Sequence, residues 1–269
     1  MAKMEIIFII LFSAVLAGNF ANGQDRMPAD SFLKLAEEYK SKSNPDSAIY
    51  YYEKAAIENE KIGNIEEEID AFNQIGVLLT RKGNYDEAKT WLNRALAKGI
   101  VSLDSNSLTL ARTYISLGVV YSAEDQFDQS LYYHNKALSI RLFKLGKNNA
   151  DVATSYGNIG NVYFRMKDYD NAITAHFKAM KIRKKLFGKN GVEVVQSYTN
   201  LGNAYKGKAE YKRSLSYYEK ALHSKIIQLG QGHKDLSVYY TRISEVYYLM
   251  NNEVKGSQYK QKAEEVVKQ

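Results

Sequence analysis

The sequence predicts an all-α solenoid of six helix-turn-helix repeats, because small residues recur at one fixed spacing. Gly118, Gly160 and Gly202 stand 42 residues apart, and a set of alanines that follows them keeps the same step. A fixed period of 20–50 residues is typical of repeat proteins, in which each unit packs mainly on its neighbours. The 269-residue chain therefore needs no single central core.

The stretch from 151 to 189 shows one repeat most clearly. Its first half carries an apolar stripe at i, i+3, i+4 and i+7, formed by Tyr156, Ile159, Gly160 and Tyr163. This spacing indicates an amphipathic helix, and a second helical stripe follows after a short polar turn. Related stripes predict units that start near residues 29, 69, 111, 153, 195 and 237. In the last unit, Gly256 and Lys260 replace larger core residues, which indicates a polar terminal cap.

The aromatic–Leu–Gly–Tyr pattern of the first helices and the Ala–aromatic–Ala pattern of the second resemble the tetratricopeptide repeat (TPR). This resemblance covers residues 29–269 and implies a right-handed superhelical solenoid whose first helices line a concave groove. The closing proline of that repeat is absent, so the second helices run on to Gly146, Gly188 and Gly230. We expect these glycines to take the left-handed conformation that ends helices. The long unit is similar to the kinesin light chain type.

The first 23 residues have the pattern of a secretory signal peptide. Lys3 precedes an apolar run from Ile6 to Ala17, and Ala21-Asn22-Gly23 offers small residues for cleavage before Gln24. The run is shorter than the roughly 20 residues of a membrane-spanning helix. We therefore expect a signal peptide at 1–23, a TPR domain at 24–269, a secreted or periplasmic protein, and no stable membrane anchor after cleavage.

The charge of the chain is uneven. Residues 24–152 hold 16 basic and 19 acidic side chains, whereas residues 153–269 hold 20 basic and 10 acidic ones. A basic C-terminal half favours an acidic partner, and an exported protein is not expected to bind nucleic acid. A basic run lies on one second helix and predicts either a solvated face or contact with an acidic lipid or polysaccharide surface; it comprises Lys178, Lys181, Arg183, Lys184, Lys185 and Lys189.

No set of residues predicts catalysis, a metal or a cofactor. His134 and His176 occupy the repeat position that Tyr52 and Tyr218 fill elsewhere, which indicates rings packed between units. The chain has no cysteine, and its histidines show no metal-ligand spacing. We therefore expect a protein that is not an enzyme.

The candidate peptide-binding residues are two pairs of asparagines on first helices. Each pair is spaced i, i+3 and so shares a helix face, and an amide can bond both N–H and C=O of a peptide backbone. The resemblance places three basic residues at the same groove. The full set is Asn158, Asn161, Asn200, Asn203, Arg165, Lys206 and Arg242. The alternative is that the asparagines only cap or solvate their helices.

Within the family, co-chaperone members hold a peptide C-terminal carboxylate with a five-residue clamp. Asn161, Asn200 and Arg242 match that clamp, whereas Gly157 and Val238 stand where it has lysines. The three matches thus imply recognition of a peptide, whereas the two missing lysines argue against specificity for its C-terminal carboxylate.

The sequence therefore predicts an exported, non-enzymatic scaffold that binds an extended peptide or protein segment in its concave groove. Two alternatives remain open. The chain could be an extracytoplasmic sensing arm that acts through a membrane signalling partner, or a self-assembling structural protein that forms homo-oligomers.

Overall fold

A computed structural model describes residues 27–268, which form an all-α solenoid, as the sequence predicts. The expected signal peptide lies outside the described residues. Twelve α-helices in this range pack as six helix-turn-helix pairs. They are α2 (Ala29–Ser41) with α3 (Pro45–Ile62), α4 (Ile65–Lys82) with α5 (Tyr85–Ser102), α6 (Leu108–Ala123) with α7 (Phe127–Leu145), α8 (Ala150–Arg165) with α9 (Tyr169–Phe187), α10 (Val192–Gly207) with α11 (Tyr211–Leu229), and α12 (Ser237–Leu249) with α13 (Glu253–Lys268).

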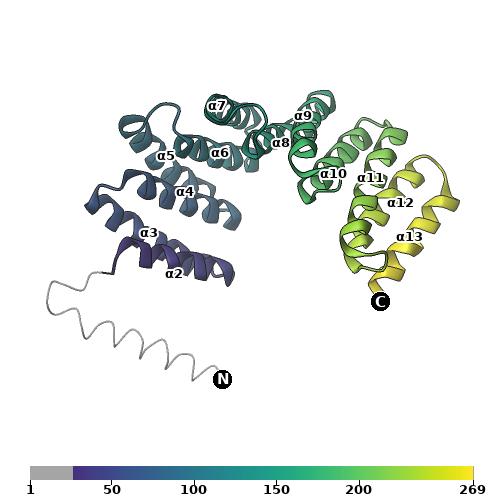
Figure 1. The fold of residues 1–269 in the computed structure, drawn as a ribbon, viewed down its shortest axis with the longest axis horizontal. Coiled ribbons are helices and arrows are strands. Elements are labelled where there is room, and N and C mark those ends of the chain that lie inside the picture. The colour runs from purple at the N-terminus through teal and green to yellow at the C-terminus, as the bar shows by residue number, and fades with distance from the viewer. Residues whose placement is uncertain (1–26, 269) are drawn as a thin grey trace, which may run out of the picture.

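The pairs follow one another along an arch, with α2 and α13 at its opposite ends (Figure 1). The helices α6 and α8 lie on the inner side of the arch, and α7 and α9 lie on the outer side. A short 3₁₀ helix, Lys234–Leu236, precedes α12. No helix within residues 27–268 combines the length and hydrophobicity that crossing a membrane requires.

A glycine of the first helix lets the two helices of a pair touch. A Cβ atom added to Gly118 would stand 2.6 Å from the ring of His134, and one added to Gly160 would stand 2.7 Å from His176. Gly202 meets Tyr218 in the same way. Both histidines are therefore buried against the first helix of their own repeat. His134 also lines a hollow with Asn158 and Val162 of the next repeat, which agrees with the expectation of a ring between units. A ring from the second helix lies flat against the backbone of the first, where no side chain fits.

A serine hydroxyl strengthens this contact in three repeats. Ser130 Oγ donates to the carbonyl of Gly118 (2.7 Å), and Ser214 Oγ donates to the carbonyl of Gly202 (2.8 Å). In the last repeat the two residue types exchange helices, so that Ser244 on α12 donates to the carbonyl of Gly256 on α13 (2.7 Å). Gly256 thus complements Ser244 and is buried, whereas Lys260, the other residue of the predicted cap, is exposed. The polar cap stays a prediction.

Stacked tyrosines hold the outer part of most pairs together. Tyr121 and Tyr133 stack with ring centroids 5.4 Å apart, and Tyr205 and Tyr217 do so at 5.5 Å. Offset stacking of this kind adds to the stability gained from burying the rings. Tyr39 with Tyr51 and Tyr247 with Tyr259 stack at the same repeat position, so these eight tyrosines serve packing.

The helix ends correct one expectation about backbone conformation. Gly146, Gly188 and Gly230 have positive φ angles (74°, 73° and 87°), but their ψ angles are 168°, 172° and 161°. They are therefore extended, in a region of backbone angles that only glycine adopts readily, and they are not in the predicted left-handed helical conformation. This geometry turns the chain directly out of the second helix toward the next repeat.

Burial of the two histidines predicts that the fold loses stability in mild acid. Burial, with a smaller effect from nearby Arg141 and Arg183, lowers the pKa of His134 and His176 to about 4. The unfolded chain takes up these protons near pH 6.5 and the folded chain does not, so stability is complete above pH 6.5 and falls below it. Between pH 6.5 and 5 each histidine should cost about 1.5 kcal/mol.

Chemical denaturation at several pH values measures this loss. The His134→Leu/His176→Leu variant is the matched control, because Leu92 occupies the same place against Gly76 in repeat two. Its unfolding free energy should change far less between pH 6.5 and 5. An equally steep loss in this variant would show that other groups cause the acid sensitivity.

Candidate functional site

The structure brings two of the four candidate asparagines together. Asn161 on α8 and Asn200 on α10 face each other, with Asn200 Nδ2 donating to Asn161 Oδ1 at 3.4 Å. Gln196, one turn before Asn200, donates to Asn200 Oδ1 at 2.9 Å. Asn158 lies nearby, and together with Asn161 and Arg165 it lines an open hollow of about 260 Å³. These side chains form a continuous row of amides from repeat four to repeat five.

Asn203 has a different environment. Its Oδ1 accepts hydrogen bonds from the hydroxyl of Tyr218 (2.6 Å) and from Arg242 Nη1 (2.9 Å). Burial raises the pKa of Tyr218, so the hydroxyl remains a donor. Asn203 therefore connects repeat five to Arg242 of repeat six, and its oxygen is already used within the chain.

The remaining basic candidates are also paired within the chain. Arg165 forms an ion pair with Asp125 (2.7 Å) and a hydrogen bond to Ser122 Oγ (2.8 Å). Lys206 pairs with Glu245 at 2.8 Å. These contacts join neighbouring repeats and reduce the positive charge that the groove presents. Whether these residues also bind a ligand stays a prediction.

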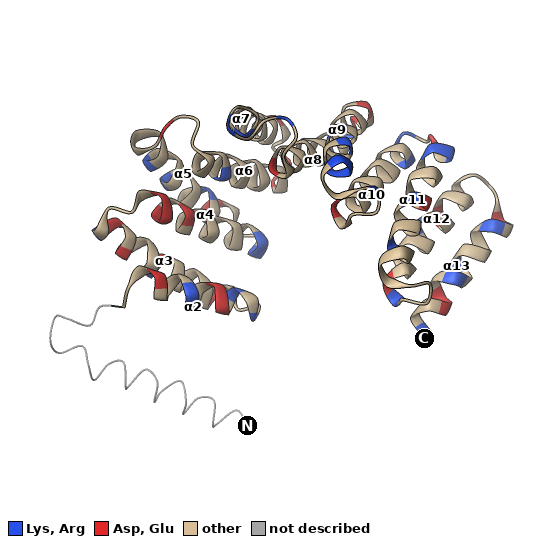
Figure 2. Ribbon diagram, viewed as in Figure 1, with Lys and Arg blue, Asp and Glu red and all other residues tan. Residues whose placement is uncertain are grey.

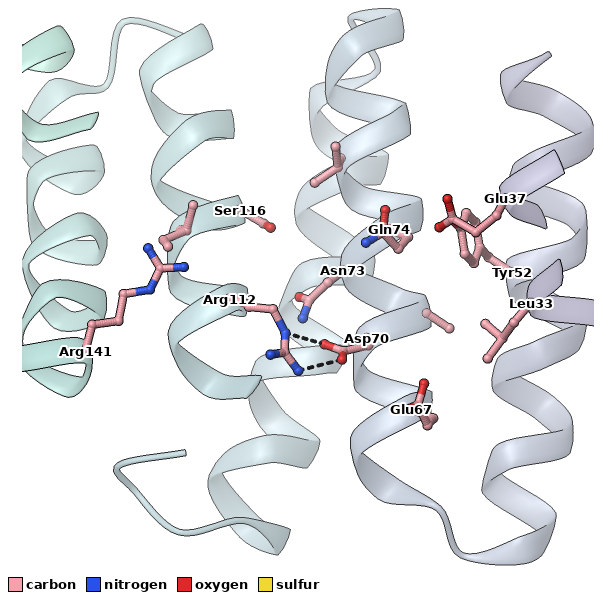
Figure 3. Close-up of a pocket in the computed structure, with 13 residues that line it drawn as sticks. Leu33, Glu37, Tyr52, Glu67, Asp70, Asn73, Gln74, Arg112, Ser116 and Arg141 are labelled. Carbon is pink, nitrogen blue, oxygen red and sulfur yellow. Dashed lines mark hydrogen bonds and ion pairs between the residues drawn. The ribbon is translucent and has the colours of Figure 1, made fainter. Parts of the chain in front are cut away.

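A larger pocket lies at the other end of the groove, in repeats one to three, and the sequence did not predict it. We call it the N-terminal pocket (Figure 3). Its volume is about 440 Å³, within the range of ligand-binding pockets. The first helices α2, α4 and α6 supply most of the lining, which comprises Leu33, Glu37, Tyr52, Glu67, Asp70, Ala71, Asn73, Gln74, Val77, Arg112, Ile115, Ser116 and Arg141.

Polar side chains on α2 and α4 shape one wall of the N-terminal pocket. Glu37 accepts hydrogen bonds from the Tyr52 hydroxyl and from Lys40 Nζ (2.9 Å), and Lys40 also donates to Gln74 at 3.0 Å. Burial acts to raise the pKa of Glu37, but these two hydrogen bonds hold it below its ordinary value. The carboxylate therefore stays ionised and fixed at the edge of the pocket.

A solvent-exposed ion pair joins α4 and α6 at the pocket. Arg112 donates to both carboxylate oxygens of Asp70, at 2.9 and 2.6 Å, as Figure 3 shows. Two parallel hydrogen bonds fix the orientation of the guanidinium. Farther along, Arg141 donates to Ser155 Oγ at 3.0 Å. Both arginines are thus held in place by the chain itself.

Asn73 is the unusual residue of this pocket. Only 4% of its surface is exposed, and neither its Oδ1 nor its Nδ2 has a hydrogen-bond partner within residues 27–268. Figure 3 shows it on the side of α4 that faces α6, above the Arg112–Asp70 pair. A buried amide without partners costs free energy, about 1–3 kcal/mol for each unsatisfied group. The structure thus holds a donor and an acceptor together at the pocket wall.

One sequence signal could have found this residue. Asn73 precedes Gly76 by three positions, and the matching places in the next three repeats hold Ile115, Gly157 and Thr199. Asparagine is the most polar of these four, at a position that faces a neighbouring helix. In repeat four, Arg183 of α9 reaches this place, 3.6 Å from where a Cβ of Gly157 would stand.

Within residues 27–268, no group of three His, Asp or Glu side chains is arranged to hold a metal ion.

Comparison with known proteins agrees with this geometry. The tetratricopeptide repeat family model matches residues 67–142 and 151–226. The structure of BtubC (BKLC) from P. vanneervenii superposes with a TM-score of 0.72 at 18% identity, covering 82% of this chain and 90% of that one. A putative kinesin light chain from Podosopora anserina gives 0.67 at 13% identity, with 74% and 94% covered. PilF of Pseudomonas aeruginosa gives 0.61 at 16% identity, with 86% and 88% covered. No curated protein sequence matches the chain.

The orphaned amide leads to a prediction about stability. Asn73→Leu keeps the approximate size of the side chain and removes both unsatisfied atoms, so the unfolding free energy should rise by about 1–2 kcal/mol. Chemical denaturation measures the change. Asn158→Leu, at a partly exposed groove position, is the matched control and should shift the value by less than about 0.5 kcal/mol. A lower stability for Asn73→Leu would show that the amide contributes to the fold.

Proposed function

The chain belongs to the tetratricopeptide repeat family, and we propose that it is a non-enzymatic scaffold that holds an extended peptide segment of a partner protein in its concave groove. Domains of this family are generally protein-binding scaffolds and are typically non-catalytic. For this chain, the place of binding is the concave groove, and the ligand is an extended segment of a partner protein.

The observation that carries the proposal is the pair of unpartnered atoms on Asn73. Both atoms are buried at the pocket wall, so a ligand would reach them once the Asn73 side chain turns into the pocket. An amide oxygen and an amide nitrogen then complement the N–H and C=O of one extended residue. Binding such a residue would satisfy both atoms and recover free energy that the unbound fold lacks.

The rest of the groove supports an extended ligand. Gln74, Ser116, Asn158 and Asn200 follow one another at steps of 42 residues, so each first helix from α4 to α10 presents one polar side chain in the same register. The helices α4 and α6 pack on each other, and packed helices lie about 8–10 Å apart, which is the length of roughly three residues of extended chain. A peptide along this part of the groove would therefore pass from Gln74 to Ser116 within about three residues.

We also propose that the protein acts outside the cytoplasm. The support for this is the signal-peptide pattern of residues 1–23, with its short apolar run and the small residues before Gln24. The partner would then be a secreted, periplasmic or envelope protein.

The N-terminal sequence of the protein from its native cell, together with cell fractionation, tests export. We expect the protein in the extracytoplasmic fraction, with Gln24 as its first residue. An intact N-terminus on a cytoplasmic protein would remove this part of the proposal and leave the groove unaffected.

Peptide binding is tested by panning a random peptide display library and measuring the affinity of enriched peptides by fluorescence anisotropy. We expect Asn73→Leu to weaken binding at least tenfold, although it raises stability, because it removes a donor and an acceptor from the site. Asn161→Ala/Asn200→Ala should weaken binding of peptides that reach repeats four and five.

A pull-down from the cell envelope with the same variants extends this test to the natural partner. Lys184→Gln, on an exposed part of α9, is the control and should leave peptide binding unchanged. If enriched peptides and the captured partner bind all variants equally well, the groove is not the binding surface. Self-association of the protein in the absence of peptide would favour the homo-oligomer instead.

A further inference from the structure

A second hollow lies in repeat four, and it is lined mainly by lysines. Its volume is about 490 Å³, and its walls come from the α7–α8 loop, from α8 and from α9. We call it the lysine pocket, and it comprises Lys147, Asn148, Tyr156, Lys178, Lys181, Ile182 and Lys185. Four of these seven residues are cationic, and the set contains no carboxylate.

The lysines of this pocket lack acidic partners. Some lysines elsewhere in residues 27–268 form ion pairs, such as Lys206 with Glu245 (2.8 Å) and Lys208 with Asp170 (2.5 Å). Within the same range no ion pair involves a lysine of the pocket. Lys178 instead lies over the ring of Tyr156, with Nζ 5.2 Å from the centroid. Four like charges around one hollow repel each other, and an anion would relieve this repulsion.

Two lysines of the pocket, Lys181 and Lys185, have no counterpart in the neighbouring repeats, whereas Tyr156 and Lys178 recur there. At the place of Ala175 the other repeats carry an aromatic residue, including Tyr133 and Tyr217, which pair with the equivalents of Tyr156. Tyr156 itself makes no ring–ring contact with any described residue. At the place of Lys185, the neighbouring repeats carry Phe143 and Ile227. Repeat four thus has a small alanine where the other repeats have an aromatic ring, and a charged lysine where its neighbours have an apolar side chain.

The lysine pocket is separate from the peptide groove. Tyr156 and Asn158 are two residues apart on α8, which places their side chains about 200° apart around the helix axis. The lining of the lysine pocket shares no residue with the hollow around Asn158, Asn161 and Arg165. Figure 2 shows basic residues on α9, which lies on the outer side of the arch. Both surfaces can therefore be occupied at the same time.

We propose that the lysine pocket is a second binding site, for a compact ligand that carries two or more clustered phosphate groups. Ammonium groups act as point charges that approach a tetrahedral phosphate from several directions, whereas the planar fork of arginine binds carboxylates and phosphates in one fixed orientation. No arginine lines the pocket. Its concave shape and its volume suit a phosphorylated small molecule or headgroup more than the flat surface of a folded protein.

Two sources share this chemistry, and they are tested separately. Calorimetric titration of tripolyphosphate into the full chain represents a free polyphosphorylated ligand. Sedimentation with vesicles that contain a phosphatidylinositol bisphosphate represents a lipid headgroup. We expect saturable binding of one of these probes, weakened by salt because the contacts are ionic. Citrate, a carboxylate of similar charge, should bind at least tenfold more weakly than tripolyphosphate.

The matched variants separate the pocket from the general charge of the chain. Lys178→Gln/Lys181→Gln/Lys185→Gln should weaken binding at least tenfold. Lys184→Gln/Lys189→Gln/Lys212→Gln removes the same charge from exposed positions outside the pocket and should change the affinity less than twofold. Equal losses in both variants, equal binding of citrate, or no saturable binding of either probe would overturn the proposal. Circular dichroism confirms that both variants are folded, and the groove peptides should bind each of them normally.

Discussion

The close contact between the two helices of each pair is the constraint on which the rest of the structure depends. Gly76, Gly118, Gly160 and Gly202 let Leu92, His134, His176 and Tyr218 lie against the first helix. This contact fixes the distance between the paired helices and thereby the direction in which each first helix presents its other face. The exchange of serine and glycine between Ser244 and Gly256 preserves the contact in the last repeat. The constraint therefore acts on the pair of residues, and not on a glycine at one position.

Patterns confined to one repeat were predictable from the sequence, and contacts between repeats were not. The 42-residue period and the stripe around Tyr156 were enough to predict the helix pairs, because they reflect packing inside a unit. The partners of Arg165 and Lys206 lie about 40 residues away, so their pairing depends on how successive repeats are set against each other. The same holds for Asn73, whose missing partners become visible only once α4 and α6 are placed side by side.

Contacts between repeats also determine how the groove presents charge. Asp70 with Arg112, Arg165 with Asp125 and Lys206 with Glu245 each join neighbouring first helices or their turns. Exposed pairs of this kind add little stability, typically less than about 1 kcal/mol, so apolar packing remains the main connection between units. Their larger effect is on recognition, since they neutralise side chains that the sequence alone presents as free positive charges.

The excess of basic residues in the C-terminal half therefore does not give the groove a positive charge, although the composition suggests that it would. A net positive charge in that half favours an acidic ligand, but the described groove offers mostly amides and paired ions. Four lysines without ion pairs line the hollow on the opposite face of α8, around Tyr156. An acidic ligand should be attracted to that face, whereas the groove is suited to read the uncharged backbone of a peptide. Because α8 carries both Tyr156 and Asn158, repeat four presents charge on one side and neutral hydrogen-bonding groups on the other.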